Sequence, residues 1–420
     1  MYELGSINLK KVSNKILHGD VNEKVSLVLN VVLVIYAALL PLSGAFSTHT
    51  GPYIILFLWI FEGNLINKYR KLKKEHVFLA FYALFGIYLI SFLWTNNLKE
   101  GIHSLKYYLS MIIIMSVYFT SLRKKIIPYT IGAFLSSMFL SEIISYGIFL
   151  DLWRVGSRGT PENPSPFMHH IKYSIFLAIT IFILIWQILN KKTDLKLKIL
   201  ESVFLVSATI NLFLNGGRTG QIGFILAVFV FTMSYFGVKL KYLLSTFALV
   251  ASITITAYHF SPIFHQRVQM GISDIEKISE GNLGTSWGLR IAMKIISYNI
   301  IKDHPMIGVG LGDFRDDFIR YLNESDLKRY DYLHHLPHVH DQFLQTAIQT
   351  GLVGLFILLT TIYFLYKKDF KDPLLKSVFI SILTIMFFSF FTEASLRNNT
   401  SALLAFLIGY FWRYDEVQDT

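Results

Sequence analysis

The sequence has 420 residues, of which 53% are hydrophobic and only 16% are charged, whereas soluble domains carry roughly 25% charged residues. So little polar surface cannot cover a soluble globule, and the composition excludes that class. The net charge of +11 could indicate a nucleic-acid partner, but in a membrane protein the simpler reason is the excess of Lys and Arg in cytoplasmic loops. No cysteine is present, which excludes disulfides, thiolate metal sites, iron–sulfur clusters and a cysteine nucleophile.

Apolar runs of about 20 residues, each long enough to cross a bilayer, recur along the whole chain. They predict an all-α integral membrane protein with about twelve transmembrane helices. The expected spans lie at 25–46, 51–66, 76–94, 105–121, 127–150, 171–190, 197–215, 219–237, 240–261, 343–366, 373–392 and 399–413, of which the second and the last are short. The expected division is helices 1–9 in 1–261, a large, partly helical periplasmic loop in 262–342, and helices 10–12 with a cytoplasmic tail in 343–420.

The basic residues test this count. Clusters of Lys and Arg occur near 10–24, 68–74, 123–125, 191–198, 239–241 and 367–376. With twelve spans every cluster falls on one side of the membrane, as the positive-inside rule requires, and both termini are then cytoplasmic. The other side receives the loops at 151–170, 215–220, 262–342 and 392–399.

The sequence of the long loop predicts a folded cap. The stretch IAMKIISYNIIKDHP is typical of an amphipathic helix that ends near Pro305, and Arg290 stands at its start. A glycine-dotted turn and a second, polar helical stretch from Asp313 to Arg320 follow. We therefore expect a small folded unit over the outer mouth of the bundle.

Arg218 follows a glycine pair in NGGRTG, at the outer end of the seventh span or the start of the eighth. An arginine at that depth is costly unless it is paired, so it often marks a binding site. Its planar fork suits phosphate oxygens, and the start of the next helix adds free backbone amides. The structural alternative is an arginine that extends to the lipid headgroups. For Arg290, the corresponding alternative is an exposed position on an amphipathic helix.

Four histidines lie close together before the tenth span: His334, His335, His338 and His340. A metal would usually need further ligands at a recognised spacing, and the sequence offers no cysteine, so we expect no metal and no other cofactor. A histidine above a phosphate-binding pocket suits a general base, because it titrates near neutral pH. Hydrogen bonding within the loop is the alternative for each of them.

Three further outer residues are additional candidates. Glu393 and Arg397 are four residues apart, a spacing at which they could simply pair with each other on one helical turn. Arg158 lies in a Gly/Ser context that could receive an anion, although Asp151 and Arg154 beside it could form local ion pairs.

The segment HDQFLQTAIQTGLVG at 340–354 resembles the signature of the bacterial O-antigen ligases and the wider ligase/polymerase superfamily. That signature is His, then Asn, Ser or Gln, then nine residues, then Gly-x-x-Gly. Here His340, Gly351 and Gly354 fit, while Asp341 departs from the usual second position. The upstream arginine-led helix followed by HP-x-x-G-x-G-x-x-x-F, and the GGRTG segment, are also similar to the family's pattern. These matches cover the second half of the chain.

The resemblance implies a metal-independent glycosyltransferase in the bacterial inner membrane, with its active site on the periplasmic face. Its donor would be a glycan on undecaprenyl diphosphate and its acceptor a hydroxyl of lipid A–core. By position, Arg218 and Arg290 would hold the diphosphate and His340 would deprotonate the acceptor. His338, Asp341, Glu393, Arg397 and Arg158 remain additional candidates.

Alternatives stay open at this point. An O-antigen polymerase uses the same donor, and a protein O-oligosaccharyltransferase differs in its acceptor. A polysaccharide transporter belongs to another class, which favours charges deep inside the spans and pseudo-symmetric halves. Glu142 is one deep charge, but the sequence shows no repeat. The partners expected are thus the lipid-linked donor, lipid A–core and membrane lipids, and no nucleic acid.

Overall fold

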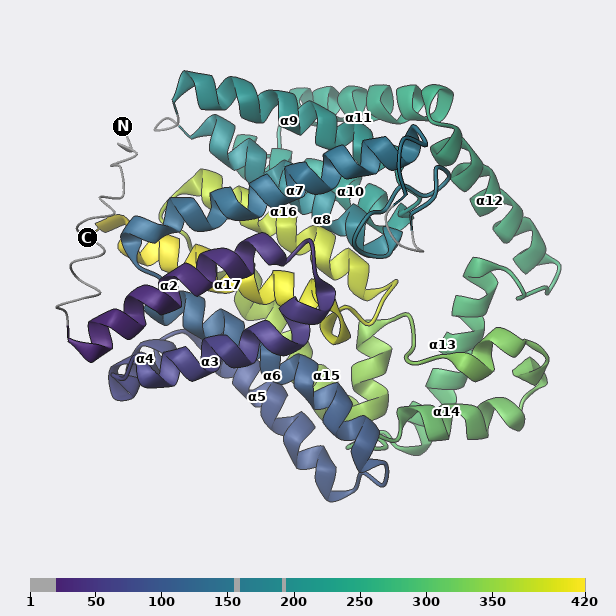
Figure 1. Cartoon of the computed structure of the whole chain (residues 1–420). Coiled ribbons are helices and arrows are strands. Elements are labelled where there is room, and N and C mark those ends of the chain that lie inside the picture. The colour runs from purple at the N-terminus through teal and green to yellow at the C-terminus, as the bar shows by residue number, and fades with distance from the viewer. Residues whose placement is uncertain (1–19, 155–158, 191–193, 420) are drawn as a thin grey trace.

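The computed structural model describes residues 20–154, 159–190 and 194–419, and this part of the chain is almost entirely helical (Figure 1). The elements are α2 (Val21–Leu39), η1 (Phe46–Thr50), α3 (Gly51–Phe61), α4 (Leu65–Lys73), α5 (His76–Ile90), η2 (Ser91–Leu93), α6 (Leu98–Ser121), η3 (Lys124–Ile126), α7 (Ile127–Phe149), α8 (His170–Leu189), α9 (Leu195–Leu214), α10 (Arg218–Phe236), α11 (Leu240–Phe260), α12 (Pro262–Ser279), α13 (Ser286–Asp303), α14 (Phe314–Asn323), η4 (Asp326–Arg329), η5 (Asp331–His335), α15 (Gln342–Lys367), α16 (Pro373–Phe390), η6 (Ser395–Arg397), α17 (Asn399–Glu416) and η7 (Val417–Asp419). One isolated bridge joins Thr160 and Asn163. The expected all-α class is confirmed.

Among the described residues, ten helices are long and apolar enough to cross a membrane. They are Val21–Leu39, His76–Leu93, Leu98–Ser121, Lys124–Phe149, His170–Leu189, Leu195–Leu214, Arg218–Phe236, Leu240–Phe260, Gln342–Lys367 and Pro373–Phe390. The expected second span forms the shorter apolar helix Phe46–Phe61, and the expected twelfth forms α17, which ends on charged residues. The chain is thus a multi-pass membrane protein. The first helix ends at Leu39 instead of 46, because Pro41 cannot continue it.

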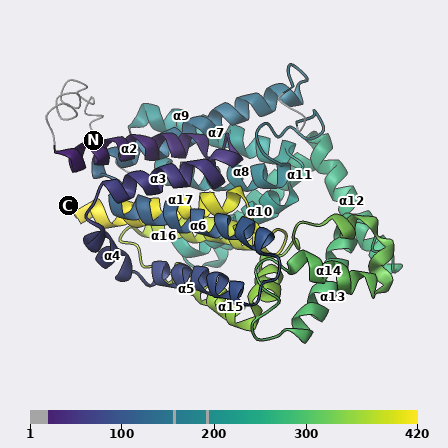
Figure 2. The same cartoon turned by 60° about the horizontal axis from the view of Figure 1, so that its bottom comes forward.

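The helices form one bundle with a shared apolar core (Figure 1). Segments far apart in sequence meet there: α17 packs against α6, and α10 packs against α16. The start of α2 and the end of α17 lie at the end of the bundle that is away from α13 and α14 (Figures 1 and 2). We call the end that carries α12–α14 the cap end.

Basic residues gather at the end opposite the cap. Lys71 forms an ion pair with Glu416 at 2.5 Å, and Lys368 pairs with Asp415 at 3.6 Å. These contacts join the 68–74 cluster, the 367–376 cluster and the C-terminal helix at one end. The alternation expected from the positive-inside rule therefore agrees with the packing of the described helices.

Residues 262–341 lie between α11 and α15 and form α12–α14, η4 and η5, and we call this segment the cap. Its apolar core comprises Ala292, Met293, Ile296, Ile300, Val309, Phe314, Phe318, Leu322, Leu333, Leu336 and Val339, together with Ile348 of α15. The amphipathic helix α13 starts earlier than expected, because Thr285 caps it by accepting from the Gly288 amide at 3.1 Å. Helix α12 was not anticipated, although Ser261 followed by Pro262 is typical of a helix start.

A break in α15 anchors the cap to the bundle. Gly351 has φ +67°, which interrupts the helix and lets the Leu352 amide bond to the Pro305 carbonyl at 2.8 Å. The chain after Pro305 runs beside this break, and the Val309 amide donates to the Ile348 carbonyl at 2.8 Å. A Cβ at Gly308 would lie 2.4 Å from that carbonyl oxygen. Gly308, in the segment after Pro305, and Gly351, in α15, therefore allow the backbones of these two segments to approach closely enough to form hydrogen bonds.

Candidate active site

The turn before α10 holds Arg218 at the cap end of the bundle. Arg218 is the first residue of α10, and Gly217 precedes it as the N-cap. Asn215 accepts from the Gly217 amide at 2.9 Å and donates to Ser165 at 2.8 Å, which fixes the turn. A Cβ at Gly217 would lie 2.5 Å from the His170 carbonyl oxygen. Gly217 and Gly220 of NGGRTG are thus required by the close approach of α10 to the start of α8.

The Arg218 guanidinium is largely enclosed but weakly partnered. Its Nη1 atom lies 4.0 Å from Asp274 Oδ2, and neither atom has a hydrogen-bond partner among the described residues. The guanidinium carbon lies 6.0 Å from the Trp287 ring. A buried charge without hydrogen bonds is costly. The group is therefore arranged to receive oxygen atoms from something other than the protein.

Two more arginines surround this group. Arg218 lies within electrostatic range of both Arg267 and Arg290. Arg267 Nη2 is near the turn, because a Cβ at Gly216 would lie 2.8 Å from it. Burial lowers the pKa of Arg267, but an arginine stays charged in proteins. The two expected arginines are thus brought together. Arg267 and Asp274, both on the unanticipated α12, were missed by the sequence analysis.

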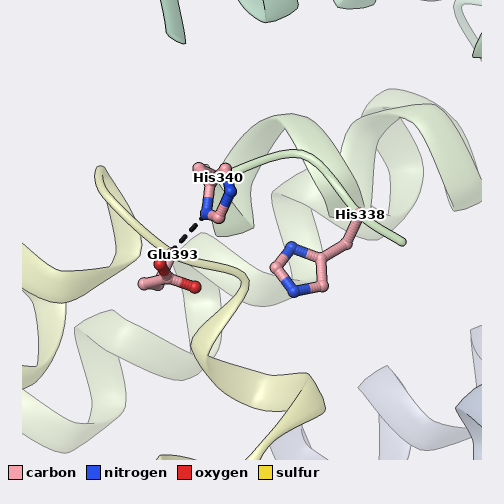
Figure 3. A group of neighbouring side chains, drawn as sticks. All are labelled: His338, His340 and Glu393. Carbon is pink, nitrogen blue, oxygen red and sulfur yellow. Dashed lines mark hydrogen bonds and ion pairs between the residues drawn. The ribbon is translucent and has the colours of Figure 1, made fainter. Parts of the chain in front are cut away.

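His340 is paired with a carboxylate from a distant part of the chain (Figure 3). Its Nδ1 atom lies 3.0 Å from Glu393 Oε1, and their side chains are only 18% and 9% exposed. Burial alone raises the pKa of the Glu393 carboxyl, but the His340 hydrogen bond and nearby positive charges hold it below its usual value. With the Nδ1 proton donated to Glu393, the Nε2 atom presents a lone pair. Tyr332 Oη lies 3.5 Å from that atom.

His338 stands beside this pair in a different state. The His338 and His340 rings are 5.2 Å apart, edge to face. Desolvation and the proximity of His340 lower the pKa of His338 to about 4, so His338 is neutral at neutral pH. Its Nδ1 atom lies 3.2 Å from the Val339 carbonyl. His338 therefore adds a polar wall to the site without adding charge.

A cation could in principle bind here. One ligand atom each from His338, His340 and Glu393 lie within 4.8 Å of one another. A hydrogen bond of 3.0 Å already joins His340 Nδ1 to Glu393 Oε1, so a metal bound through these two atoms would have to displace it. The expectation that no metal takes part remains a prediction.

The other candidate residues have local roles. Asp341 caps α15 by accepting from the Leu344 amide at 3.0 Å, and it lies 3.3 Å from Lys294. It therefore orients the start of the helix and not the His340 ring. His334 bonds to the Lys328 carbonyl at 3.0 Å, and His335 lies 3.8 Å from Asp331.

The pairing considered for Glu393 and Arg397 is wrong for this structure. Glu393 instead pairs with His340, and Arg397 donates to Ser104 at 2.8 Å. The reason is that Arg397 lies in the short turn η6 and not on a helical turn shared with Glu393. Asp151 and Arg154 do lie 3.9 Å apart on the surface. Arg158 lies outside the described residues.

Electrostatic proximity links the arginines with the histidine–carboxylate pair. Arg290 lies within electrostatic range of Arg218 and also of Glu393. His170, the first residue of α8, is within range of Arg218, Arg267 and Glu393. A chain of charged neighbours thus connects α10, α12 and α13 with the loop that follows α16.

Residues 203–359 match the family model described as O-antigen ligase. Over this stretch the chain is similar to the O-antigen ligase family. The matched segment begins within α9 and ends within α15, so it includes Arg218, Arg267, Arg290 and His340. Glu393 lies beyond it. The match therefore supports the resemblance to the O-antigen ligase/polymerase superfamily over the segment that holds most of the candidate residues.

One relative is an uncharacterized protein of Haemophilus influenzae, which is 27% identical over 267 residues. The similarity covers 59% of this chain and 66% of the relative, slightly less than two thirds of its length. This likeness adds no activity to the one that the family match suggests.

Proposed function

We propose that the protein transfers a polymerised O-antigen glycan from undecaprenyl diphosphate to a hydroxyl of lipid A–core, on the periplasmic face of the bacterial inner membrane. One observation supports the proposal: the weakly partnered Arg218 is in electrostatic range of Arg267 and Arg290, and Arg290 is also in range of Glu393, which pairs with His340. The first group suits a diphosphate, and the second suits the deprotonation of a hydroxyl.

The reaction is a displacement at the anomeric carbon of the donor. His340 Nε2 takes the acceptor hydroxyl proton as the acceptor oxygen bonds to that carbon. The bond between the carbon and the diphosphate oxygen breaks, and its electron pair leaves with the diphosphate. The arginines stabilise this growing negative charge, which is the largest electrostatic change in the reaction. Glu393 holds the imidazole in the required tautomer and stabilises the imidazolium that forms.

An apolar cavity supports a polyprenyl donor. It has a volume of about 840 Å³ and lies among α8, α9, α10 and α11. Phe213, Leu214 and Ser261 line its cap end, and the NGGRTG turn follows Leu214 directly. A long hydrocarbon chain in this cavity would bring its diphosphate toward Arg218.

A deletion strain tests the function through its glycolipids. Free lipid-linked polymer together with unmodified lipid A–core is the result expected. A single repeat unit on the core would instead identify a polymerase, and loss of glycan from proteins alone would identify a protein transferase. Re-expression of the wild-type chain should restore the glycan, and re-expression of His340→Ala should not.

A further inference from the structure

A cationic cavity lies at the cap end of α6, apart from the arginines of α10 and α12. It has a volume of about 480 Å³, between the first turns of α6 and the cap. Its basic lining residues are Lys99, His103, Lys106, Arg315 and Arg397. Within the described part of the chain, Glu100 is the only acidic residue that lines it. The cavity therefore favours an anion.

Among the described residues, none of these basic side chains has a carboxylate partner. Lys99, Lys106 and Arg315 are exposed. The nearby Asp316 accepts from Asn97 at 3.0 Å. Because these residues lie at the cap end, the basic bias of the opposite end does not account for them.

A second hollow continues from the first toward the membrane-spanning part. It has a volume of about 720 Å³ and shares His103 and Lys106 with the cationic cavity. Its deeper wall is the face of α3 that carries Tyr53, Ile54 and Phe57. Ile54 is 43% exposed and Phe57 is 59% exposed. Together the two hollows offer cations above and an apolar surface below, which matches a lipid with an anionic head.

The cationic cavity also adjoins the candidate base. Pro337 and Arg397 form part of its wall, and Pro337 lies immediately before His338. Arg397 is within electrostatic range of His338. A ligand in this cavity thus approaches the His338–His340 segment from α3 and α6, while α10 and α12 supply the donor arginines.

We propose that the two hollows bind the acceptor, an anionic glycolipid whose phosphate or carboxylate groups contact Lys106, Arg315 and their neighbours while an acyl chain lies along α3. Its role as acceptor rests on the proposed function. The site explains how the enzyme holds two lipids at once: the donor and the acceptor use different helices and meet at His340.

The test measures binding without catalysis. The full chain in detergent is titrated with a bisphosphorylated lipid A–core, and the complex is quantified by native mass spectrometry. The double variant Lys106→Gln/Arg315→Gln should bind about tenfold more weakly, as expected for two exposed charge contacts. The control Lys277→Gln/Lys302→Gln removes the same charge from exposed positions on α12 and α13 and should bind as the wild type does. The same glycolipid after removal of its phosphates should bind weakly and equally to all three proteins.

Two outcomes would overturn the site: unchanged binding by the Lys106/Arg315 variant, or equally tight binding of phosphatidylglycerol by the wild type. If the Lys106/Arg315 variant binds normally while the deletion strain lacks glycan on its lipid A–core, the proposed acceptor site is refuted and the proposed function is retained. Selective binding together with unchanged glycolipids in the deletion strain would support the site and refute the function.

Discussion

The two halves of the site differ in how completely the protein satisfies them. Arg218 Nη1 has its nearest carboxylate at 4.0 Å and no hydrogen bond among the described residues. His340, in contrast, already holds Glu393 at 3.0 Å in a largely enclosed contact. The comparison predicts that oxygen atoms of the substrate complete the contacts of Arg218, the cationic half, whereas His340 and Glu393, the basic half, are paired before a substrate binds. Each variant below tests one side of this comparison.

Removal of the base should have the largest effect. We expect His340→Ala to reduce the rate of glycan transfer by about 10³-fold, within the range that general-base catalysis contributes. The measurement is transfer by the purified protein from lipid-linked glycan to lipid A–core. The matched control is His335→Ala, because His335 is exposed and contacts only Asp331 in the cap. Near-normal transfer by His340→Ala would mean that the His340–Glu393 pair has only a structural role.

Donor binding at Arg218 should depend on the planar shape of the guanidinium as well as on its charge. We expect Arg218→Lys to lower kcat/KM for the donor by about 100-fold, since a point charge replaces a two-pronged donor. Arg320→Lys is the control, because Arg320 is exposed and pairs with its helical neighbour Asp317. Full activity of Arg218→Lys would show that the guanidinium does not grip a diphosphate.

Loss of the carboxylate charge should have a smaller effect. We expect Glu393→Gln to lower kcat by about tenfold with little change in KM, because the amide oxygen still accepts from Nδ1 but no longer stabilises an imidazolium. Glu280→Gln, an exposed cap position, is the control. An unchanged kcat in Glu393→Gln, or a rise in KM as large as the fall in kcat, would contradict a role in stabilising the imidazolium.

The smallest effect concerns stability at acid pH. The pKa of His338 is lowered to about 4 in the folded protein, below the ordinary value of about 6.5. Its stabilising contribution is therefore complete above pH 6.5 and is lost as the pH falls toward 4. Thermal unfolding should show the wild type losing up to about 2 kcal/mol between pH 7 and pH 5 relative to His338→Gln. Parallel losses in both proteins would contradict this account.

The sequence was sufficient for features that depend on local pattern. Apolar runs located the membrane helices, the position of Arg218 at the outer end of a span singled it out, and the family resemblance added Arg290 and His340 as candidates. Local pattern could not reveal that Glu393, 53 residues after His340, would supply the carboxylate, because that contact depends on how α15 and α16 pack. A spacing of four residues suggested the pair Glu393–Arg397, but the helical turn that it requires is absent there.

Helix α12 was missed for a related reason. Its residues are too polar for a span, and they follow α11 with only Ser261 between the two helices. The sequence analysis therefore joined them to a loop, and Arg267 and Asp274 were not considered. The Ser261–Pro262 start signal could have identified the helix, but the proximity of Arg267 to Gly216 comes only from tertiary packing.

The break at Gly351 places the candidate base among anchored segments. Residues 342–350 of α15 are joined to the cap by backbone hydrogen bonds at Ile348 and Gln349, and His340 directly precedes them. Beyond the break, the Leu352 amide bonds to the Pro305 carbonyl, so the cap is tied to α15 on both sides of Gly351. Glu393 belongs to a different segment, between α16 and α17, but the Leu396 amide of that segment donates to Gln342 Oε1 at 2.8 Å. The first turn of α15 therefore fixes the imidazole and the loop of its carboxylate in one arrangement, with no substrate needed to bring them together.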